Sequence, residues 1–262
     1  MVINPGTQTG NCLIGLKIGD TWSYISKTAP VGGFLRGKKY VVEIHTADAI
    51  DSPPIDGDGN VYNTVTIGTQ TWMAENLKTT KYNDNTPIPN VTDNSTWHGL
   101  TTGAYCWYDN NETTYKATYG ALYNWFAVDN NAATRAASNG GKNICPTGWH
   151  VPADTEWTTL TNYLGGTSAA GAKLKETGTV HWAAPNTEAT NSTGFTALPQ
   201  DYRFYDGLFK YNNPSDGYWW SFTTNYGNPY FMVLYSSNSH FEKYECLKTF
   251  GYSVRCLKDM VL

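Results

Sequence analysis

Thiols and imidazoles, which bind zinc and copper and serve as nucleophiles or bases, are sparse in this sequence. Cysteines stand at positions 12, 106, 145, 246 and 256, and histidines at 45, 98, 150, 181 and 240. The cysteines form no Cys-x-x-Cys pair and no histidine has zinc-finger spacing, so we expect no zinc site. A Ser-His-Asp arrangement cannot be inferred from residues this scattered. The sequence therefore predicts no metal, no cofactor and no enzymatic activity.

One oxygen-rich string, Asp56-Gly57-Asp58-Gly59-Asn60, is similar to the start of a calcium loop. Position 12 of such a loop would be Ile67, where a bidentate glutamate is needed. We therefore interpret the string as a turn that uses the backbone freedom of glycine and asparagine.

Composition limits the classes of partner. The 262 residues carry a net charge of −4 without a basic run, which argues against nucleic acid. No segment approaches the roughly 20 apolar residues of a membrane span. Ten tryptophans and nineteen tyrosines among many Asn, Thr, Ser and Gly are typical of a ligand-recognising surface, although we expect most tryptophans to serve the core. Met1–Gly10 lack the features of a secretory signal, so either the protein is not exported or the chain is a mature or truncated form of an exported protein, and we favour the second interpretation.

The pattern of strands and breakers divides the chain. Three short strands are predicted near the start, at Leu13–Ile18, Thr21–Ser26 and Lys39–His45. They are too few to fold alone. Pro53 and Pro54 then interrupt the pattern, because neither can donate to a strand ladder. We predict a short β segment over 1–50, a linker over 51–55 and the main domain over 56–262.

The main domain mixes helices with antiparallel strands. A hairpin is predicted at Thr66–Met73, and the remaining strands at Gly217–Phe222, Tyr230–Tyr235 and Tyr252–Leu257. Apolar spacing predicts helices at Gly120–Ala127, from Asp154 to Leu164 and, as a short piece, at Ala169–Lys175. Two main helices followed by loops and terminal strands indicate an α+β domain.

Ordered sequence blocks carry a family resemblance. They are Asp58–Tyr62 (DGNVY), Trp72–Leu77 (WMAENL), Gly103–Tyr108 (GAYCWY), Tyr119–Trp125 (YGALYNW), Cys145–Pro152 (CPTGWHVP), Gly194–Pro199 (GFTALP), Gly217–Ser221 (GYWWS) and Ser253–Cys256 (SVRC). From about Asp56 to Asp259 the chain resembles the Fibrobacter succinogenes major paralogous family. The resemblance implies a loop-rich, C-type-lectin-like fold with two helices and small antiparallel sheets, in the branch that holds formylglycine-generating enzymes. It also implies a surface or secreted protein of Bacteroidetes-like bacteria.

Several residues are interpreted with this resemblance in view. In an exported protein we expect a disulfide between Cys145 and Cys256, which would close a loop of roughly 110 residues. Ala153 stands where the family usually has a threonine, so the following helix should start more weakly by about 1 kcal/mol. His150 is interpreted as a hydrogen-bonded structural histidine. Ala184-Pro185-Asn186 lacks the carboxylate of the calcium-dependent sugar sites of such lectins.

The largest departure from the family pattern lies at Asn225–Lys248, an irregular series of bulky and charged residues. It resembles the variable proteins of diversity-generating retroelements, in which adenine-directed mutagenesis rewrites Asn-type codons on the ligand face. Ordinary loop divergence is the open alternative. The predicted ligand-binding residues are Trp220, Phe222, Asn225, Tyr226, Asn228, Tyr230, Tyr235, His240, Phe241, Lys243 and Tyr244.

Three hypotheses about function stay open. The first is an extracellular or cell-surface adhesin or receptor that binds a protein or glycan of a host, neighbouring cell or phage. The second is a structural pilus or tip subunit, because Gly37-Lys38-Lys39-Tyr40 resembles a turn near the end of a fimbrillin-like domain. An accessory hairpin is the alternative for that segment. The third is a copper-dependent redox enzyme, but Cys246 and Cys256 are ten residues apart and Cys256 is assigned to Cys145.

Overall fold

The structure is a computed structural model that describes residues 11–18, 21–28, 49–50, 53–129, 141–209 and 215–259. The chain divides into two compact units, Met1–Pro53 and Pro54–Leu262. Two consecutive prolines, Pro53 and Pro54, stand at the junction, where no strand ladder needs their missing amide hydrogens.

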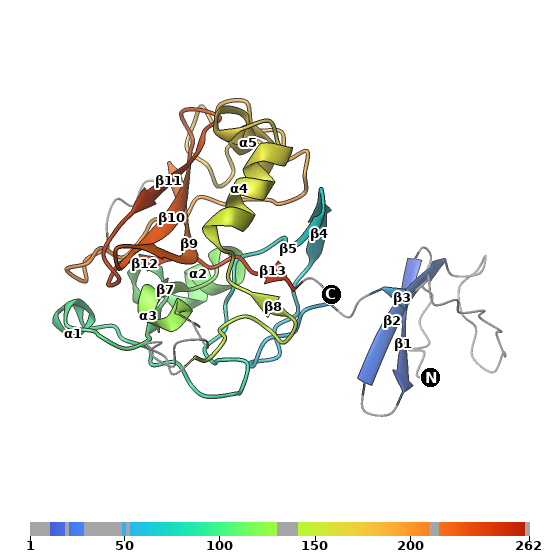
Figure 1. The fold of residues 1–262 in the computed structure, drawn as a ribbon, viewed down its shortest axis with the longest axis horizontal. Helices are drawn as coiled ribbons and strands as arrows, with labels where there is room; N and C mark the ends of the chain where they lie inside the picture. The colour runs from blue at the N-terminus through green and yellow to red at the C-terminus, as the bar shows by residue number, and fades with distance from the viewer. Residues whose placement is uncertain are drawn as a thin grey trace. The chain divides into compact units, whose positions relative to one another are not determined.

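The described residues of the small unit form a three-stranded antiparallel sheet. Its strands are β1 (Asn11–Ile18), β2 (Thr21–Thr28) and β3 (Ala49–Ile50), in the order β1-β2-β3 (Figure 1). The first two predicted strands, Leu13–Ile18 and Thr21–Ser26, are thus confirmed. The third, Lys39–His45, lies outside the described residues.

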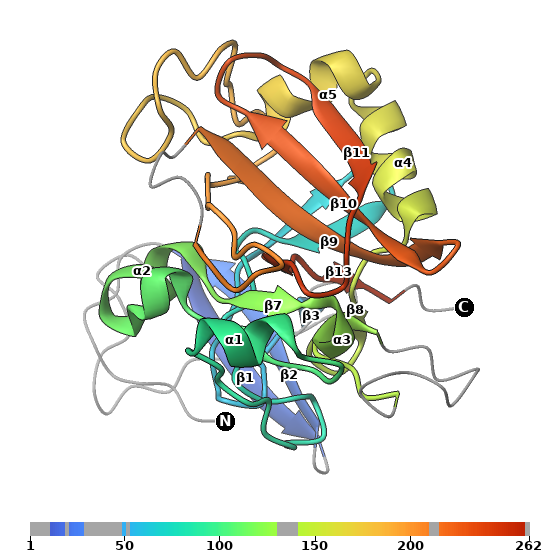
Figure 2. The same ribbon diagram turned by 90° about the vertical axis from the view of Figure 1, so that its left-hand side faces the viewer.

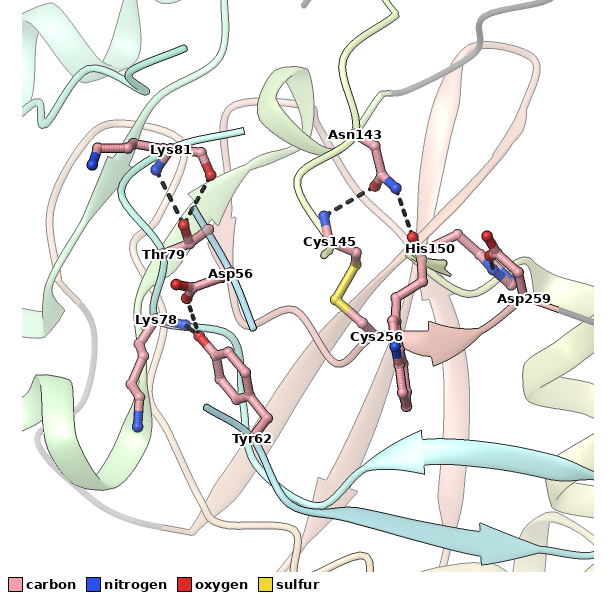
Figure 3. Close-up of a disulfide and its surroundings, with 11 residues drawn as sticks. Asp56, Tyr62, Lys78, Thr79, Lys81, Asn143, Cys145, His150, Cys256 and Asp259 are labelled. Carbon is pink, nitrogen blue, oxygen red and sulfur yellow. Dashed lines mark hydrogen bonds and ion pairs between the residues drawn. A yellow bond between two sulfur atoms is a disulfide. The ribbon is translucent and has the colours of Figure 1, made fainter. Parts of the chain in front are cut away.

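The first sheet of the large unit brings segments from its beginning, middle and end together. Its strands, in spatial order, are β4 (Thr64–Ile67), β5 (Gln70–Met73), β13 (Leu257–Lys258) and β8 (Trp149–His150). β4 and β5 form the predicted hairpin. Cys145 precedes β8 and Cys256 precedes β13, and a disulfide joins them across 6.0 Å between Cα atoms (Figure 3).

The second sheet shows that the helix predicted over Gly120–Ala127 is wrong for much of its length. Its strands, in spatial order, are β12 (Gly251–Tyr252), β7 (Leu122–Asn124) and β6 (Tyr105–Cys106). Only α3 (Trp125–Val128) is helical. Buried Asn124 marks the change from strand β7 to helix α3, because its Oδ1 accepts from the N–H groups of Ala104 at 2.9 Å and of Ala127 at 3.1 Å. One side chain thus joins β7 to the preceding segment and caps α3.

Two short α-helices and a 3-10 turn in this region were not predicted. They are α1 (Asn94–His98), the 3-10 helix η2 (Tyr108–Asn110) and α2 (Glu112–Tyr119). Asp93 caps α1 by accepting from the N–H of Thr96 at 2.7 Å, and Asn111 caps α2 by accepting from the N–H of Thr114 at 3.0 Å. Neither helix has a clear apolar stripe, so the capping residues are the local sequence signals for where these helices start.

Two further helices confirm the sequence prediction. They are α4 (Asp154–Tyr163) and α5 (Thr167–Leu174). Ala153 supplies no capping side chain, but the Glu156 carboxylate accepts from the Ala153 N–H at 2.8 Å. The Thr223 hydroxyl, from a strand 69 residues away, accepts from the Asp154 N–H at 3.0 Å. A tertiary contact therefore satisfies one of the amide groups that a helix start leaves unpaired.

The third sheet carries most of the predicted ligand-binding residues. Its antiparallel strands, in spatial order, are β11 (Phe241–Glu245), β10 (Asn228–Tyr235) and β9 (Asp216–Asn225). The predictions of strands at Gly217–Phe222 and Tyr230–Tyr235 are confirmed. A single strand over Tyr252–Leu257 is wrong, because its ends belong to β12 and β13 in different sheets. β11 was not predicted.

The core explains the tryptophan content. All nine tryptophans of residues 53–129, 141–209 and 215–259 are buried, which confirms their expected core role. Buried Arg255 joins the end of β5 to two loop segments, since its guanidinium donates to Asn76 Oδ1 and to the carbonyls of Met73 and Phe195. The large unit is therefore an α+β domain with several small antiparallel sheets. Among the helices described, none combines the length and apolar character needed to cross a bilayer.

Candidate functional site

One side of the β9-β10-β11 sheet carries a continuous aromatic surface. Side chains alternate between the two sides of a strand, and the register brings Tyr218, Phe231 and Tyr244 to the same side. The Phe231 ring centroid lies 6.1 Å from that of Tyr218 and 6.0 Å from that of Tyr244. Rings from neighbouring segments extend the surface. We call the following six residues the aromatic face: Tyr202, Tyr218, Phe231, Tyr244, Phe250 and Tyr252.

Burial is graded across the aromatic face. Tyr252 and Phe231 are 2% and 9% exposed and form its floor, whereas Tyr244 is 48% exposed. Tyr202, Tyr218 and Phe250 are half-buried. Figure 2 shows the three strands with α4 and α5 on the far side. The outer rings are thus available to a ligand while the inner rings fix their positions.

Two carboxylates lie among these rings. The Tyr244 hydroxyl donates to Glu242 at 2.8 Å, and this hydrogen bond holds the pKa of the Glu242 carboxyl below its ordinary value. His240 Nδ1 lies 3.2 Å from the same carboxylate. Burial raises the pKa of Asp216, although the Tyr218 hydroxyl donates to it at 3.1 Å. The aromatic face therefore offers hydrogen-bond acceptors beside apolar rings.

The described residues contain no group of three or more His, Cys, Asp or Glu side chains that could hold a metal. In the Asp56–Asn60 turn, the Asp56 carboxylate accepts from the Asn60 N–H at 2.9 Å. It also accepts from the Tyr62 hydroxyl at 2.5 Å (Figure 3). These oxygens close the turn on itself. Thr80 and Lys81 engage the neighbouring Asp58.

His150 bridges two carboxylates at the start of α4. Its Nδ1 lies 2.6 Å from Asp259 and its Nε2 lies 3.0 Å from Glu156. Burial works to lower the pKa of His150, but these hydrogen bonds and charges raise it overall. Because Glu156 also caps α4, the histidine ties the helix start to the end of the described chain. This geometry fits a structural histidine.

Comparison with known proteins identifies the family of this fold. The profile of the Fibrobacter succinogenes major domain matches residues 65–258. The chain belongs to this family. No curated protein and no solved structure matches the chain. In this Fibrobacter succinogenes major domain, the matched range runs from β4 to β13 and so includes the aromatic face.

Two predicted contact residues belong to the core of this Fibrobacter succinogenes major domain. Trp220 and Phe241 have no exposed surface. The Trp220 indole N–H donates to the Tyr123 carbonyl at 2.7 Å, and Phe241 packs edge-on against Trp157 with centroids 5.6 Å apart. A ligand on the surface cannot touch either ring, so their assignment as ligand contacts is wrong. Strand alternation sends part of any bulky run into the core.

The remaining predicted residues do not form one patch. Tyr235, His240 and Tyr244 gather around Glu242 on the side of the aromatic face. Lys243 instead points toward α4, where its Nζ lies 2.8 Å from Asp154 and 4.4 Å from the ring centroid of Tyr230.

Four further predicted residues lie at the β9-β10 hairpin. These are Phe222, Asn225, Tyr226 and Asn228. Tyr226 is fully exposed at the turn, with φ of 47°, and Asn228 is also exposed. Asn225 donates to Glu245 at 2.7 Å, and Phe222 is half-buried against the core. The hairpin end is thus an exposed extension of the sheet.

Sequence reasoning missed other members of the aromatic face. Tyr202 and Phe250 come from segments outside the sheet, and only the tertiary fold brings them to Tyr218 and Tyr252. The sequence did contain a local signal for Glu242. It stands two residues before Tyr244, and residues two apart in a strand lie on the same side. The pair Asp216 and Tyr218 has the same spacing.

Proposed function

We propose that this protein is a surface-exposed, adhesin-like or receptor-like member of its family that holds a protein or glycan ligand on the aromatic face. The observation that carries the proposal is the graded burial of six rings over a tryptophan core. Rigid aromatic rings give a ligand large contact area at little cost in conformational entropy. The partly exposed rings of the aromatic face can provide this contact area, because the buried rings of Phe231 and Tyr252 hold them in place.

The polar groups give the proposed site its specificity. Glu242 has a lowered pKa and is an acceptor at neutral pH, and Asp216 is a second acceptor beside Tyr218. A ligand that stacks on the rings must therefore present hydroxyl or N–H groups at their margins. Both sugar hydroxyls and peptide amides satisfy this condition, so the same geometry supports a glycan or a protein.

We further propose that the domain has a C-type-lectin-like fold whose C-terminal face is diversified by a retroelement. Asn228, Lys243, Tyr244 and fully exposed Tyr226 carry side chains that can change without altering the core. Substitutions at such positions usually alter stability by less than about 0.5 kcal/mol. The neighbouring DNA tests this part: we expect a near-copy of the segment coding for Tyr218–Val254, differing mainly at adenines, beside a reverse transcriptase.

A binding protein is proposed in preference to a redox enzyme. Cys256, which a copper-thiolate pair would require, is bonded to Cys145. Burial raises the pKa of the Cys246 thiol, which disfavours the thiolate that copper binds. Detectable copper-dependent turnover that is lost in Cys246→Ser would reverse this preference.

Glycan and protein arrays probed with the intact chain test the site. The informative variant is Tyr244→Ala, and Tyr163→Ala is its matched control, because Tyr163 is a 66% exposed tyrosine on α4. For the ligand found, we expect Tyr244→Ala to weaken binding at least about tenfold, as loss of an aromatic anchor does. Tyr163→Ala should bind like the wild type. Equal binding by Tyr244→Ala and the wild type would remove the aromatic face as the site.

A further inference from the structure

β11 is an edge strand, and among the residues that the structure describes no strand pairs with its outer backbone edge. The sheet order places β10 on one side of it only. The Cys246 N–H donates to the Pro229 carbonyl at 3.2 Å, which fixes the hydrogen-bonding parity of the β10-β11 ladder. Alternate residues therefore turn their N–H and C=O groups away from β10. These outward residues are Phe241, Lys243 and Glu245.

A groove runs between this edge strand and α4. It has a volume of about 170 Å³ and is lined by residues of α4, β10 and β11, which Figure 2 shows on the same side of the large unit. Buried Trp157, Met232 and Phe241 lie beneath the groove, and Thr158 and Asn162 of α4 stand at its exposed rim. A strand added beside β11 would direct every second side chain toward this groove.

We propose that the open edge of β11 and the groove beside α4 bind an extended polypeptide segment as a fourth strand of the sheet. The groove is separate from the aromatic face, because Lys243 and Phe241 lie on the opposite side of β11 from Tyr244, whereas the alternate side chains of an added strand would lie on the side of Glu242 and Tyr244. Main-chain hydrogen bonds to Phe241, Lys243 and Glu245 supply affinity, and the groove supplies selectivity.

The charges of β11 define the partner. Asp154 neutralises Lys243 at 2.8 Å, so Glu242 and Glu245 leave the strand with acidic character. A basic side chain next to Glu242 on the aromatic side would complement it, since opposite charges across neighbouring strands are stabilising. The partner is therefore an extended segment that alternates Lys or Arg with apolar residues, one of which enters the groove.

A second copy of this chain fits the edge poorly. Antiparallel pairing of two β11 edges centred on Lys243 would set Lys243 opposite its own copy. Like charges directly opposite each other destabilise a sheet. The edge therefore favours a different polypeptide.

A pair of substitutions at one position tests the proposal. Lys243→Pro removes the outward N–H but leaves the ladder to β10, because proline is tolerated where the N–H faces solvent. Lys243→Ala keeps that N–H and removes the same side chain. The probe is an array of acetylated hexapeptides that alternate Lys or Arg with each apolar residue, read by fluorescence polarisation. We expect the best peptide to bind the wild type, to retain binding to Lys243→Ala within about threefold, and to bind Lys243→Pro at least about tenfold more weakly.

A second measurement does not depend on the folding of the proline variant. The same peptide, methylated on alternate backbone nitrogens so that the edge cannot accept from it, should lose binding to the wild-type protein. The proposal is overturned if no peptide binds, if Lys243→Pro and Lys243→Ala bind equally, or if Tyr244→Ala alone abolishes binding. A wild-type dimer that Lys243→Pro dissolves would identify a second copy as the occupant and would also overturn it.

Discussion

The disulfide between Cys145 and Cys256 gives the most quantitative prediction about this fold. It joins residues 111 apart in the sequence. In the chain-entropy description, removing a cross-link that closes such a loop costs about 5 kcal/mol of unfolding free energy. For an m-value of about 2.5 kcal/mol per M, the urea midpoint should fall by about 2 M in the Cys145→Ala, Cys256→Ala double variant.

Tryptophan fluorescence during urea unfolding measures this effect in the right part of the chain, since nine of the ten tryptophans lie in the large unit. Cys106→Ala is the matched control, because Cys106 is equally buried but is not cross-linked. We expect the control to lose about 1 kcal/mol, as a typical core substitution does. If the double variant unfolded at the same urea concentration as Cys106→Ala, the assigned cross-link and its loop would be refuted.

Three further predictions concern α4, α5 and their contacts. The pKa of His150 is raised in the folded protein, so its protonated ring stabilises the fold fully below the pKa of about 6.5 in the unfolded chain and less as the pH rises through the folded-state pKa. His150→Gln should therefore cost more stability at about pH 5.5 than at about pH 8.5. A cost that grows with pH in urea titrations would contradict the carboxylate contacts. Helix propensity favours Gly171→Ala by about 1 kcal/mol, but a Cβ there would lie 2.6 Å from the Ser239 carbonyl oxygen, so we expect a lower melting temperature. A higher one would rule out this close approach. Ala153→Thr should raise the unfolding free energy by about 1 kcal/mol, and no gain in a denaturant titration would mean that Thr223 already supplies the full cap.

Local sequence sufficed where one pattern had one interpretation. Trp157, Leu160 and Leu164 recur at helical spacing after acidic residues, and α4 forms there. The same pattern misled the prediction around Asn124. Leu122, Trp125 and Phe126 also recur at helical spacing, although a strand occupies part of that segment. In a fully buried segment, the spacing of apolar residues does not distinguish a helix from a strand. The bonds of Asn124 to distant backbone groups decide between them.

The candidate site was predicted in the right third of the chain but not residue by residue. Tyr244 and Phe241 belong to the same strand, yet one is half-exposed and the other is fully buried. A shift of one residue in the register of a strand exchanges its two sides, so the sides cannot be assigned until the strand's start and partner are known. The sequence of β11, FEKYE, lacks the regular alternation of apolar and polar residues that would reveal which side is buried.

The sequence by itself determined the family, the α+β class, the helices α4 and α5 and the concentration of aromatic residues, because these follow from local patterns and ordered blocks. Tertiary structure alone decided that Tyr202 and Phe250 meet Tyr218, that Trp220 and Phe241 are buried, and that β11 has an open edge beside α4. The physical reason is that burial, register and strand neighbours depend on contacts between residues far apart in the chain, which no local pattern encodes.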